Sequence, residues 1–186
     1  MMTANKIRTT RTIMVIAALV LTLGIAIPVV AADSITLSVN GEGRSANVSG
    51  ASLDPVDYSH EDQTSSGTIS LSIDDSSASN DGWNVTIQAS DFSSGERSIS
   101  AMNFSIIEAG NPVRLEGQEI DATGGPVVPE SSALGSLDVP RKVLGAESEF
   151  GAGAYSQGLN VSLTVPGQTP SGEYSSSLTV NITAGP

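Results

Sequence analysis

The chain has no cysteine and a single histidine, His60, among its 186 residues. Without cysteine it can form no disulfide and has no thiolate to act as a nucleophile or zinc ligand. The histidine stands in a polar segment, and no Gly-x-Ser-x-Gly element supplies a serine nucleophile for it to activate. Twenty acidic residues make chance carboxylate pairs inevitable, so such pairs do not indicate a glycosidase. We therefore predict no catalytic residues, no metal site and no cofactor.

Basic residues are also scarce, with eight Lys and Arg against twenty Asp and Glu and a net charge of −12. Three of the eight, Lys6, Arg8 and Arg11, lie at the N-terminus. The rest of the chain therefore carries 5 − 20 = −15. Such a surface repels phosphate backbones and anionic lipid headgroups, which argues against binding to nucleic acid or to a membrane surface. Cations or a basic partner fit the charge better.

The only long apolar run, Ile13 to Ile27, follows these basic residues and ends before Pro28 and a small-residue stretch that closes at Ala32. This layout predicts a secretory signal peptide over residues 1–32, cleaved after Ala32. The alternative is a retained membrane anchor, but the run is shorter than the roughly 20 residues that span a bilayer. No cysteine near the site offers a lipid anchor. We expect a secreted protein whose residues 33–186 form one domain that leaves the membrane.

After the signal, no long segment repeats apolar residues with helical spacing. The clearest pattern is the strand within Asp81 to Phe92, which carries the only tryptophan. There Trp83, Val85, Ile87 and Ala89 alternate with polar residues, as in a half-buried strand. An acidic, turn-rich run precedes this strand and Ser93-Ser94-Gly95 follows it, so its ends are sharply defined.

Similar alternation predicts strands at Ser34 to Asn40, around Ala46 and Val48, and at 69–73, 99–106, 113–115, 134–139, 142–144, 159–165 and 174–182. The phase change within 99–106 suggests a bulge near Met102-Asn103. We expect 69–73 to form a hairpin with the tryptophan strand, and Gly50 to Gly67 to be a loop. Together these features predict an all-β fold, an antiparallel β-sandwich of about eight or more strands.

Two segments carry a family resemblance. The first is Gly82-Trp83-Asn84-Val85-Thr86-Ile87, which leads into Ser90-Asp91-Phe92. The second runs from Pro170 to Ile182 and contains Gly172-x-Tyr174 followed by Leu178-Thr179-Val180-Asn181-Ile182. In order and position they resemble the two Trp-x-Leu elements of the WxL domain of bacterial surface proteins. Val85 replaces the first leucine, while Val180 and Ile182 replace the second tryptophan and leucine.

The resemblance implies noncovalent attachment to the bacterial cell wall, through peptidoglycan or an associated glycan, or to other surface proteins. It also singles out Trp83, Val85, Tyr174, Leu178 and Thr179 as binding or motif residues. The alternative function is a structural or adhesin-like subunit of an extracellular assembly, in which exposed edge strands pair with neighbours. Either function places the protein outside the cell.

Two candidate sites have plainer interpretations. Trp83 could offer a stacking surface to a sugar ring, but on an alternating strand it is predicted to be a core residue. Asp74, Asp75, Asn80 and Asp81 offer oxygen ligands of the kind calcium takes, yet they lack the spacing of a calcium loop, which favours a solvated turn. The five Asn-x-Ser/Thr triplets, beginning at Asn47, Asn84, Asn103, Asn160 and Asn181, reflect a Ser/Thr-rich chain, although a suitable host could glycosylate them.

Overall fold

The protein is described by a computed structural model that covers residues 37–49, 52–129 and 132–186. The predicted signal peptide, residues 1–32, lies outside this range, as do the first residues of the strand expected at Ser34 to Asn40. Residues Ser38–Pro186 form one compact unit. Within the described residues there is no helix with the length and apolar character needed to cross a membrane.

The described residues form eleven strands and one short 3-10 turn, Ala101–Asn103. The strands are β1 (Arg44–Ser49), β2 (Gln63–Asp75), β3 (Trp83–Ala89), β4 (Phe92–Ser94), β5 (Arg97–Ile99), β6 (Phe104–Ala109), β7 (Val113–Gly117), β8 (Gly135–Ser136), β9 (Arg141–Ala146), β10 (Gly153–Val165) and β11 (Leu178–Ala184).

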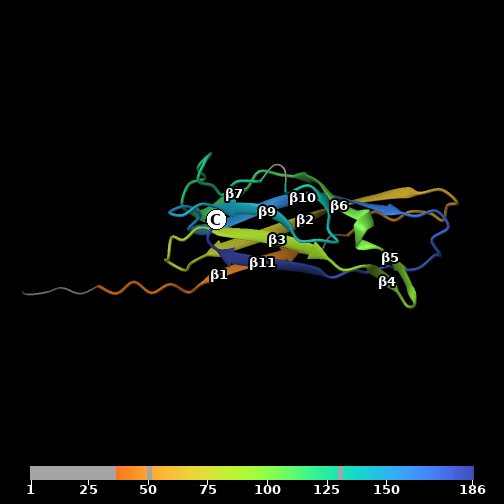
Figure 1. The fold of residues 1–186 in the computed structure, drawn as a ribbon, viewed down its shortest axis with the longest axis horizontal. Coiled ribbons are helices and arrows are strands. Elements are labelled where there is room, and N and C mark those ends of the chain that lie inside the picture. The colour runs from red at the N-terminus through yellow and green to blue at the C-terminus, as the bar shows by residue number, and fades with distance from the viewer. Residues whose placement is uncertain (1–36, 50–51, 130–131) are drawn as a thin grey trace, which may run out of the picture. The chain divides into compact units, whose positions relative to one another are not determined.

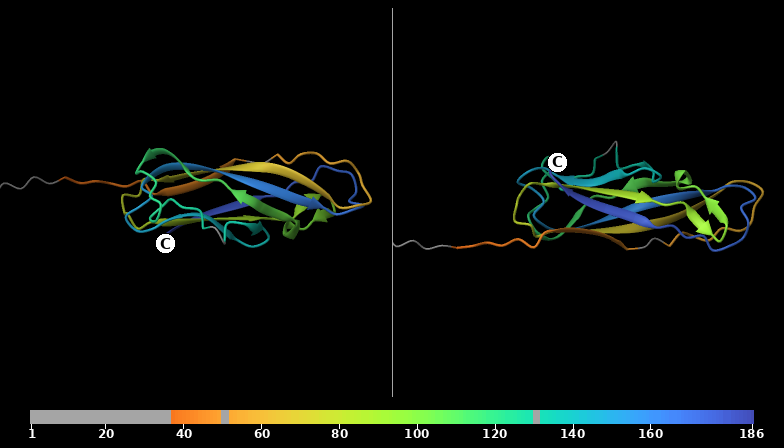
Figure 2. Two further views of the ribbon diagram at one scale, coloured as in Figure 1. Left: turned by 90° about the horizontal axis from the view of Figure 1, so that it is seen from above. Right: turned by 60° about the horizontal axis from the view of Figure 1, so that its bottom comes forward.

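The strands form two main sheets that pack face to face (Figures 1 and 2). One sheet has the order β1-β2-β10-β6-β8, with β7 also paired to β10, and the other has the order β11-β3-β9. A small hairpin, β4-β5, completes the set, and every pairing of strands is antiparallel. The predicted all-β antiparallel sandwich is confirmed.

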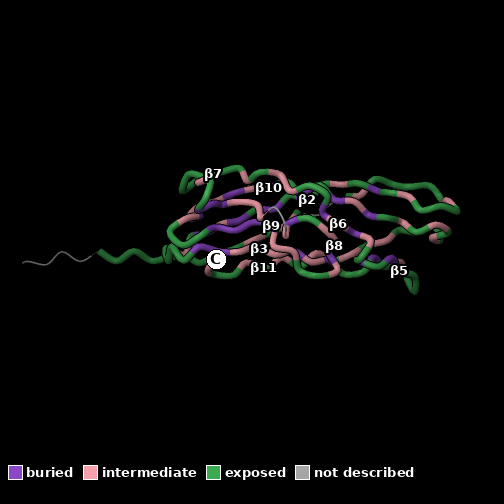
Figure 3. Tube along the Cα trace, turned by 45° about the horizontal axis from the view of Figure 1, so that its top comes forward, coloured by how far each residue is buried: buried purple, intermediate pink, exposed green. Residues whose placement is uncertain are grey.

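The two longest strands, β2 and β10, run the length of the domain and define its two ends. They pair over 13 residues, from Gln63 opposite Val165 at one end to Asp75 opposite Gly153 at the other. Alternate residues along both strands are buried between the sheets, as the purple segments of Figure 3 show. The same period-2 pattern that predicted the strands therefore also builds the core.

The tryptophan strand lies at the centre of the smaller sheet, and its burial follows the predicted alternation. Trp83, Val85 and Ile87 are fully buried, while the polar residues between them are partly exposed. The Trp83 ring lies against Tyr155 of β10 on the facing sheet, with centroids 6.3 Å apart. The prediction that Trp83 is a core residue is confirmed.

A buried ion pair joins β1 to β2 at the Asp75 end of the domain. Arg44 Nε lies 3.1 Å from Asp75 Oδ2, and the two side chains are 12% and 2% exposed. The second carboxylate oxygen of Asp75 accepts hydrogen bonds from the backbone N–H and the hydroxyl of Ser77, and Arg44 Nη2 donates to Ser79 Oγ. These bonds fix the turn that follows β2.

The expected strand at Ser34 to Asn40 is not found in its described part. Residues 37–40 form no strand, and Leu37 and Val39 are 84% and 75% exposed. Alternation gives a segment two distinct faces, but a strand also needs a neighbour to take its backbone hydrogen bonds. No described strand pairs with residues 37–40. The first strand instead begins at Arg44, and the expected strand around Ala46 and Val48 is confirmed as β1.

The predicted hairpin between 69–73 and the tryptophan strand is wrong. β2 and β3 lie in opposite sheets, β2 between β1 and β10 and β3 between β11 and β9. Residues 76–82 connect the two strands and carry the chain from one sheet to the other, so β2 and β3 share no backbone hydrogen bonds. Part of the expected loop at Gly50 to Gly67 is also strand, because β2 already begins at Gln63.

The expected bulge near Met102-Asn103 is replaced by the 3-10 turn, whose N-cap is Ser100. The turn carries the chain from β5, in the small hairpin, to β6, in the large sheet, so that Ile99 and Phe104 both reach the core. The segment 134–139 is strand only at Gly135–Ser136, with Leu137 buried and its neighbours more exposed. The strands expected at 113–115, 142–144 and 159–165 are confirmed.

Candidate functional site

The two motif segments of the sequence lie side by side, because β11 pairs with β3. Val180 is opposite Ile87 and Ile182 is opposite Val85, so the second element faces the core beside the first. Val180, which stands in the position of the second motif tryptophan, is half-buried on this inner face. The motif therefore describes the inner face of one sheet, and its eroded positions are packing positions.

The five predicted motif residues occupy three different environments. Trp83 and Val85 are fully buried, and Trp83 Nε1 donates to the Gly151 carbonyl at 2.9 Å. A buried indole has no free face on which a ligand could stack. Leu178 is half-buried opposite Ala89, while Thr179 is exposed opposite Gln88. Tyr174, ahead of β11, is half-buried, and its hydroxyl donates to the Pro170 carbonyl at 2.9 Å.

Tyr174 lines a cleft of about 490 Å³ at the Gln63 end of the domain. We call it the tyrosine cleft, because Tyr58 also lines it and is 60% exposed. Phe92, at the end of the first motif segment, also lines it and is packed edge to face on Phe104 with centroids 5.1 Å apart. The cleft thus joins parts of both motif segments with a loop that lies before β2.

Two loops at the tyrosine cleft, one before β2 and one after β10, are held together by hydrogen bonds. Gln168 N–H donates to the Ser59 carbonyl at 2.7 Å, and Gly167 N–H donates to Asp62 Oδ1 at 2.8 Å. A side chain at Gly167 would collide with the His60 carbonyl, since an added Cβ would lie 2.4 Å from that oxygen. The His60 ring packs edge to face on Tyr58 at 5.4 Å. The Tyr58 ring is therefore held on an ordered loop.

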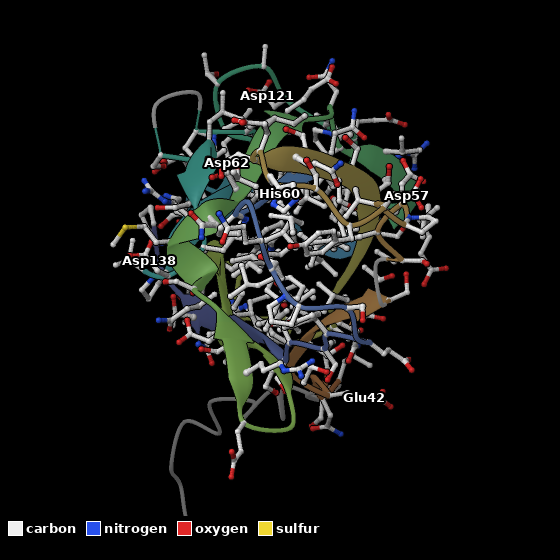
Figure 4. All side chains as sticks on the ribbon, turned by 90° about the vertical axis from the view of Figure 1, so that its right-hand side faces the viewer. Glu42, Asp57, His60, Asp62, Asp121 and Asp138 are labelled. Carbon is white, nitrogen blue, oxygen red and sulfur yellow. The ribbon has the colours of Figure 1, made fainter. Side chains whose placement is uncertain are left out.

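The rim of the tyrosine cleft is acidic. Asp54, Asp57, Glu61 and Glu173 line it, and none of its lining residues is basic. Figure 4 views this end of the domain, with His60 near the middle and Asp57 and Asp62 on either side. Gln63 also lines the cleft, and its Oε1 is buried without a hydrogen-bond partner in the described part of the chain. The cleft therefore offers aromatic surface and hydrogen-bond acceptors, which suit hydroxyl, amide or amine donors.

Sequence reasoning did not single out Tyr58 or Phe92 as site residues. Tyr58 lies in the segment expected to be a loop, and neither alternation nor spacing distinguished it there. The only available signal was a tyrosine in an otherwise polar stretch beside the single histidine.

A second hollow, of about 590 Å³, is lined by residues 107–109, 111–112, 120–122, 126–128 and 133–134. It contains none of the motif residues. Its most exposed large hydrophobic residue is Ile107, on β6.

Asp121 lines this hollow, and the pKa of its carboxyl group can be tested. Its Oδ1 accepts hydrogen bonds from Gly124 N–H and from the hydroxyl and N–H of Thr123, which lower its pKa from the usual 3.8. A carboxyl with a lowered folded-state pKa adds stability above its unfolded pKa and loses that contribution as pH falls through the folded value. We expect an NMR titration to place the Asp121 pKa below 3.8 and Thr123→Ala to move it back up. An unchanged pKa in that variant would contradict the assignment.

No group of three acidic or histidine side chains in the described ranges could hold a metal ion. In the acidic turn before β3, Asp75 is already engaged by Arg44 and Ser77, and Asp74 accepts a hydrogen bond from Ser76. The oxygens that the sequence offered for calcium thus do not converge on one point.

Comparisons with known proteins agree with the family resemblance of the sequence. The family model described as WxL domain, surface cell wall-binding, matches residues 31–186. No curated protein matches. A solved family 123 glycoside hydrolase from Clostridium perfringens, described in connection with glycolipid glycan hydrolysis, is similar at 16% identity and a TM-score of 0.37. The match covers 76% of this chain and 25% of the hydrolase chain. A TM-score this low carries no argument about fold or activity.

Proposed function

The chain belongs to the WxL family of surface cell-wall-binding domains, and we propose that it holds the wall through the tyrosine cleft. The family makes it a cell-wall-associated surface protein. Beyond this, we propose which site binds the wall and which wall polymer it binds. We also propose that residues 1–32 are removed on export and that residues 33–186 act as one noncatalytic binding domain.

The observation that carries this proposal is the convergence of both motif segments on one cleft. Phe92 from the first segment and Tyr174 from the second line the same hollow, and Tyr58 adds an exposed ring. Exposed aromatic rings on a fixed loop can contact the apolar face of a sugar at a small cost in conformational entropy. Trp83 does not line the cleft; it packs on Tyr155 towards the opposite end of the domain, where it stabilises the fold.

The charge of the cleft favours peptidoglycan over phosphate-bearing wall polymers. Asp54, Asp57, Glu61 and Glu173 would repel a phosphate chain. The same carboxylates accept hydrogen bonds from sugar hydroxyls and amides, and they attract free amines on the peptide stems. The ligand class is therefore a neutral or amine-bearing glycan and peptide network.

The test is a pelleting assay with purified residues 33–186 and isolated cell walls. We expect Tyr58→Ala to weaken wall binding roughly tenfold, the loss expected when an aromatic anchor is removed. Because Tyr58 is exposed, its thermal unfolding should stay close to that of the parent chain. Ile107→Ala, which shortens an exposed side chain in the second hollow, is the matched control and should bind normally.

Walls extracted to remove phosphate-bearing polymers should bind as much protein as native walls, or more. Loss of binding to extracted walls would instead identify the phosphate polymer as the ligand. If the parent chain stays in the supernatant at low and moderate salt, the wall-binding proposal fails. If Tyr58→Ala and Ile107→Ala bind alike, the cleft is not the site.

A further inference from the structure

The edge of the smaller sheet lacks the protection that exposed edge strands usually have. β11 pairs with β3 on one side and with no described strand on the other. Its seven residues, Leu-Thr-Val-Asn-Ile-Thr-Ala, include no charge and no proline, and its register with β3 shows no bulge. Charges, prolines and bulges are the usual devices that prevent an edge strand from pairing with another chain. Their absence leaves β11 open to an added strand.

The core beside this edge is also incompletely covered. Val180 and Ile182 point inward but are only half-buried, whereas Val85 and Ile87 next to them on β3 are fully buried. The inward residues of β1, the edge strand of the other sheet near β11, are likewise half-buried. An apolar seam therefore runs between the two edge strands, and an added strand with apolar side chains on one face would cover it.

The chain itself contains a segment of that kind. Residues 34–40, Ser-Ile-Thr-Leu-Ser-Val-Asn, alternate apolar and polar side chains over seven residues and carry no charge. Leu37 and Val39 are 84% and 75% exposed. The absence of charge matters because residues 33–186 carry −15, so charged contacts between two copies would be repulsive. Residues 34–40 and β11 are thus matched in length, alternation and neutrality.

We propose that residues 34–40 of one copy add as a strand to β11 of a second copy, with Ile35, Leu37 and Val39 covering the apolar seam. Within one copy, residues 38–40 belong to the same compact unit as β11 yet form no strand with it. The proposal places the acceptor on another molecule, so the association should depend on protein concentration. Repeated from copy to copy, this contact builds an open chain, and exchanged reciprocally it closes a dimer.

Sedimentation of residues 33–186 over a range of concentrations tests the association. We expect oligomers for the parent chain and a monomer for the double variant Leu37→Lys and Val39→Lys, because lysines cannot enter the apolar seam. The matched control, Ser38→Lys and Asn40→Lys, adds the same charge on the other face and should still associate. Since lysines reduce the net negative charge, repulsion cannot explain a loss. A monomeric parent at every concentration, or equal loss in both double variants, would overturn the proposal.

Wall pelleting of the Leu37→Lys and Val39→Lys variant keeps this proposal separate from the proposed function. Neither Leu37 nor Val39 nor any residue of β11 lines the tyrosine cleft, so the monomeric variant should still pellet with walls. An associating parent that fails to pellet refutes wall binding alone, and a pelleting parent that stays monomeric refutes strand addition alone.

Cysteine pairs locate the acceptor, because the chain has none of its own. A Ser38→Cys preparation is oxidised with preparations of Thr179→Cys, Asn181→Cys or Thr183→Cys, three outward positions along β11. We expect at least one disulfide between the two kinds of chain, since bonded cysteines need Cα atoms within about 7 Å. Asn47→Cys, outward on β1, is the control. Bonding to Asn47→Cys with none to β11 would overturn the choice of edge.

Discussion

Trp83→Ala is expected to lose about 3 to 5 kcal/mol of unfolding free energy, the usual cost of truncating a buried tryptophan. The ring fills the space between β3 and Tyr155, and its Nε1 satisfies the Gly151 carbonyl. Removing it leaves a cavity and a buried acceptor without a partner. Chemical denaturation followed by circular dichroism would measure the loss, since no other tryptophan is present to report by fluorescence.

Two further variants separate packing from the hydrogen bond. Trp83→Phe keeps most of the buried area and loses the bond, so its cost should be about 1 to 3 kcal/mol. Gly151→Ala keeps the ring but places a Cβ 2.7 Å from Trp83 Nε1, at a backbone φ of +82° that favours glycine. It should also destabilise. A Trp83→Ala chain that stayed fully stable and lost only wall binding would show that the tryptophan is a binding residue.

Arg44→Met is expected to cost about 3 kcal/mol, the lower end of the range for breaking a buried ion pair. The change leaves the Asp75 carboxylate 2% exposed and without its cation, although Ser77 still donates to it. Urea denaturation at neutral pH would measure the loss.

The double variant Arg44→Met and Asp75→Leu is the control for this pair. Replacing both charges with apolar groups removes the unpaired charge, so most of the lost stability should return. A double variant as unstable as Arg44→Met would mean that the arginine acts through its bond to Ser79 rather than through Asp75.

The sequence predicted which residues are buried better than it predicted which strands are neighbours. Trp83, Leu71 and Leu159 all alternate with polar residues, and all are fully buried. Alternation indicates which face of a strand is buried and which is exposed to solvent, but it does not indicate which strand pairs with it. The hairpin expected between β2 and β3 was wrong for this reason, because both strands bury one face whether they pair together or face each other across the core.

The candidate site was predictable only in part. Tyr174 could be named because a motif carries it, and the register of β11 on β3 explains why that motif has apolar positions. Tyr58 could not be named, because its role depends on a loop that hydrogen bonds to residues 167 and 168 help to hold in place. Contacts across about 100 residues of sequence leave no local pattern.

β2 and β10 pair along the whole length of the domain, so attachment at one end determines where the other end lies. The tyrosine cleft lies at the Gln63 end, whereas Arg44 pairs with Asp75 and Ala184 with Trp83 at the opposite end. Strands rise about 3.3 Å per residue, so roughly 40 Å of β2 separate these ends. A domain that binds the wall through its cleft would therefore point the start of β1 and the end of β11 away from the wall. A fluorescent protein joined after Pro186 should leave adhesion intact and stand on the side facing the medium.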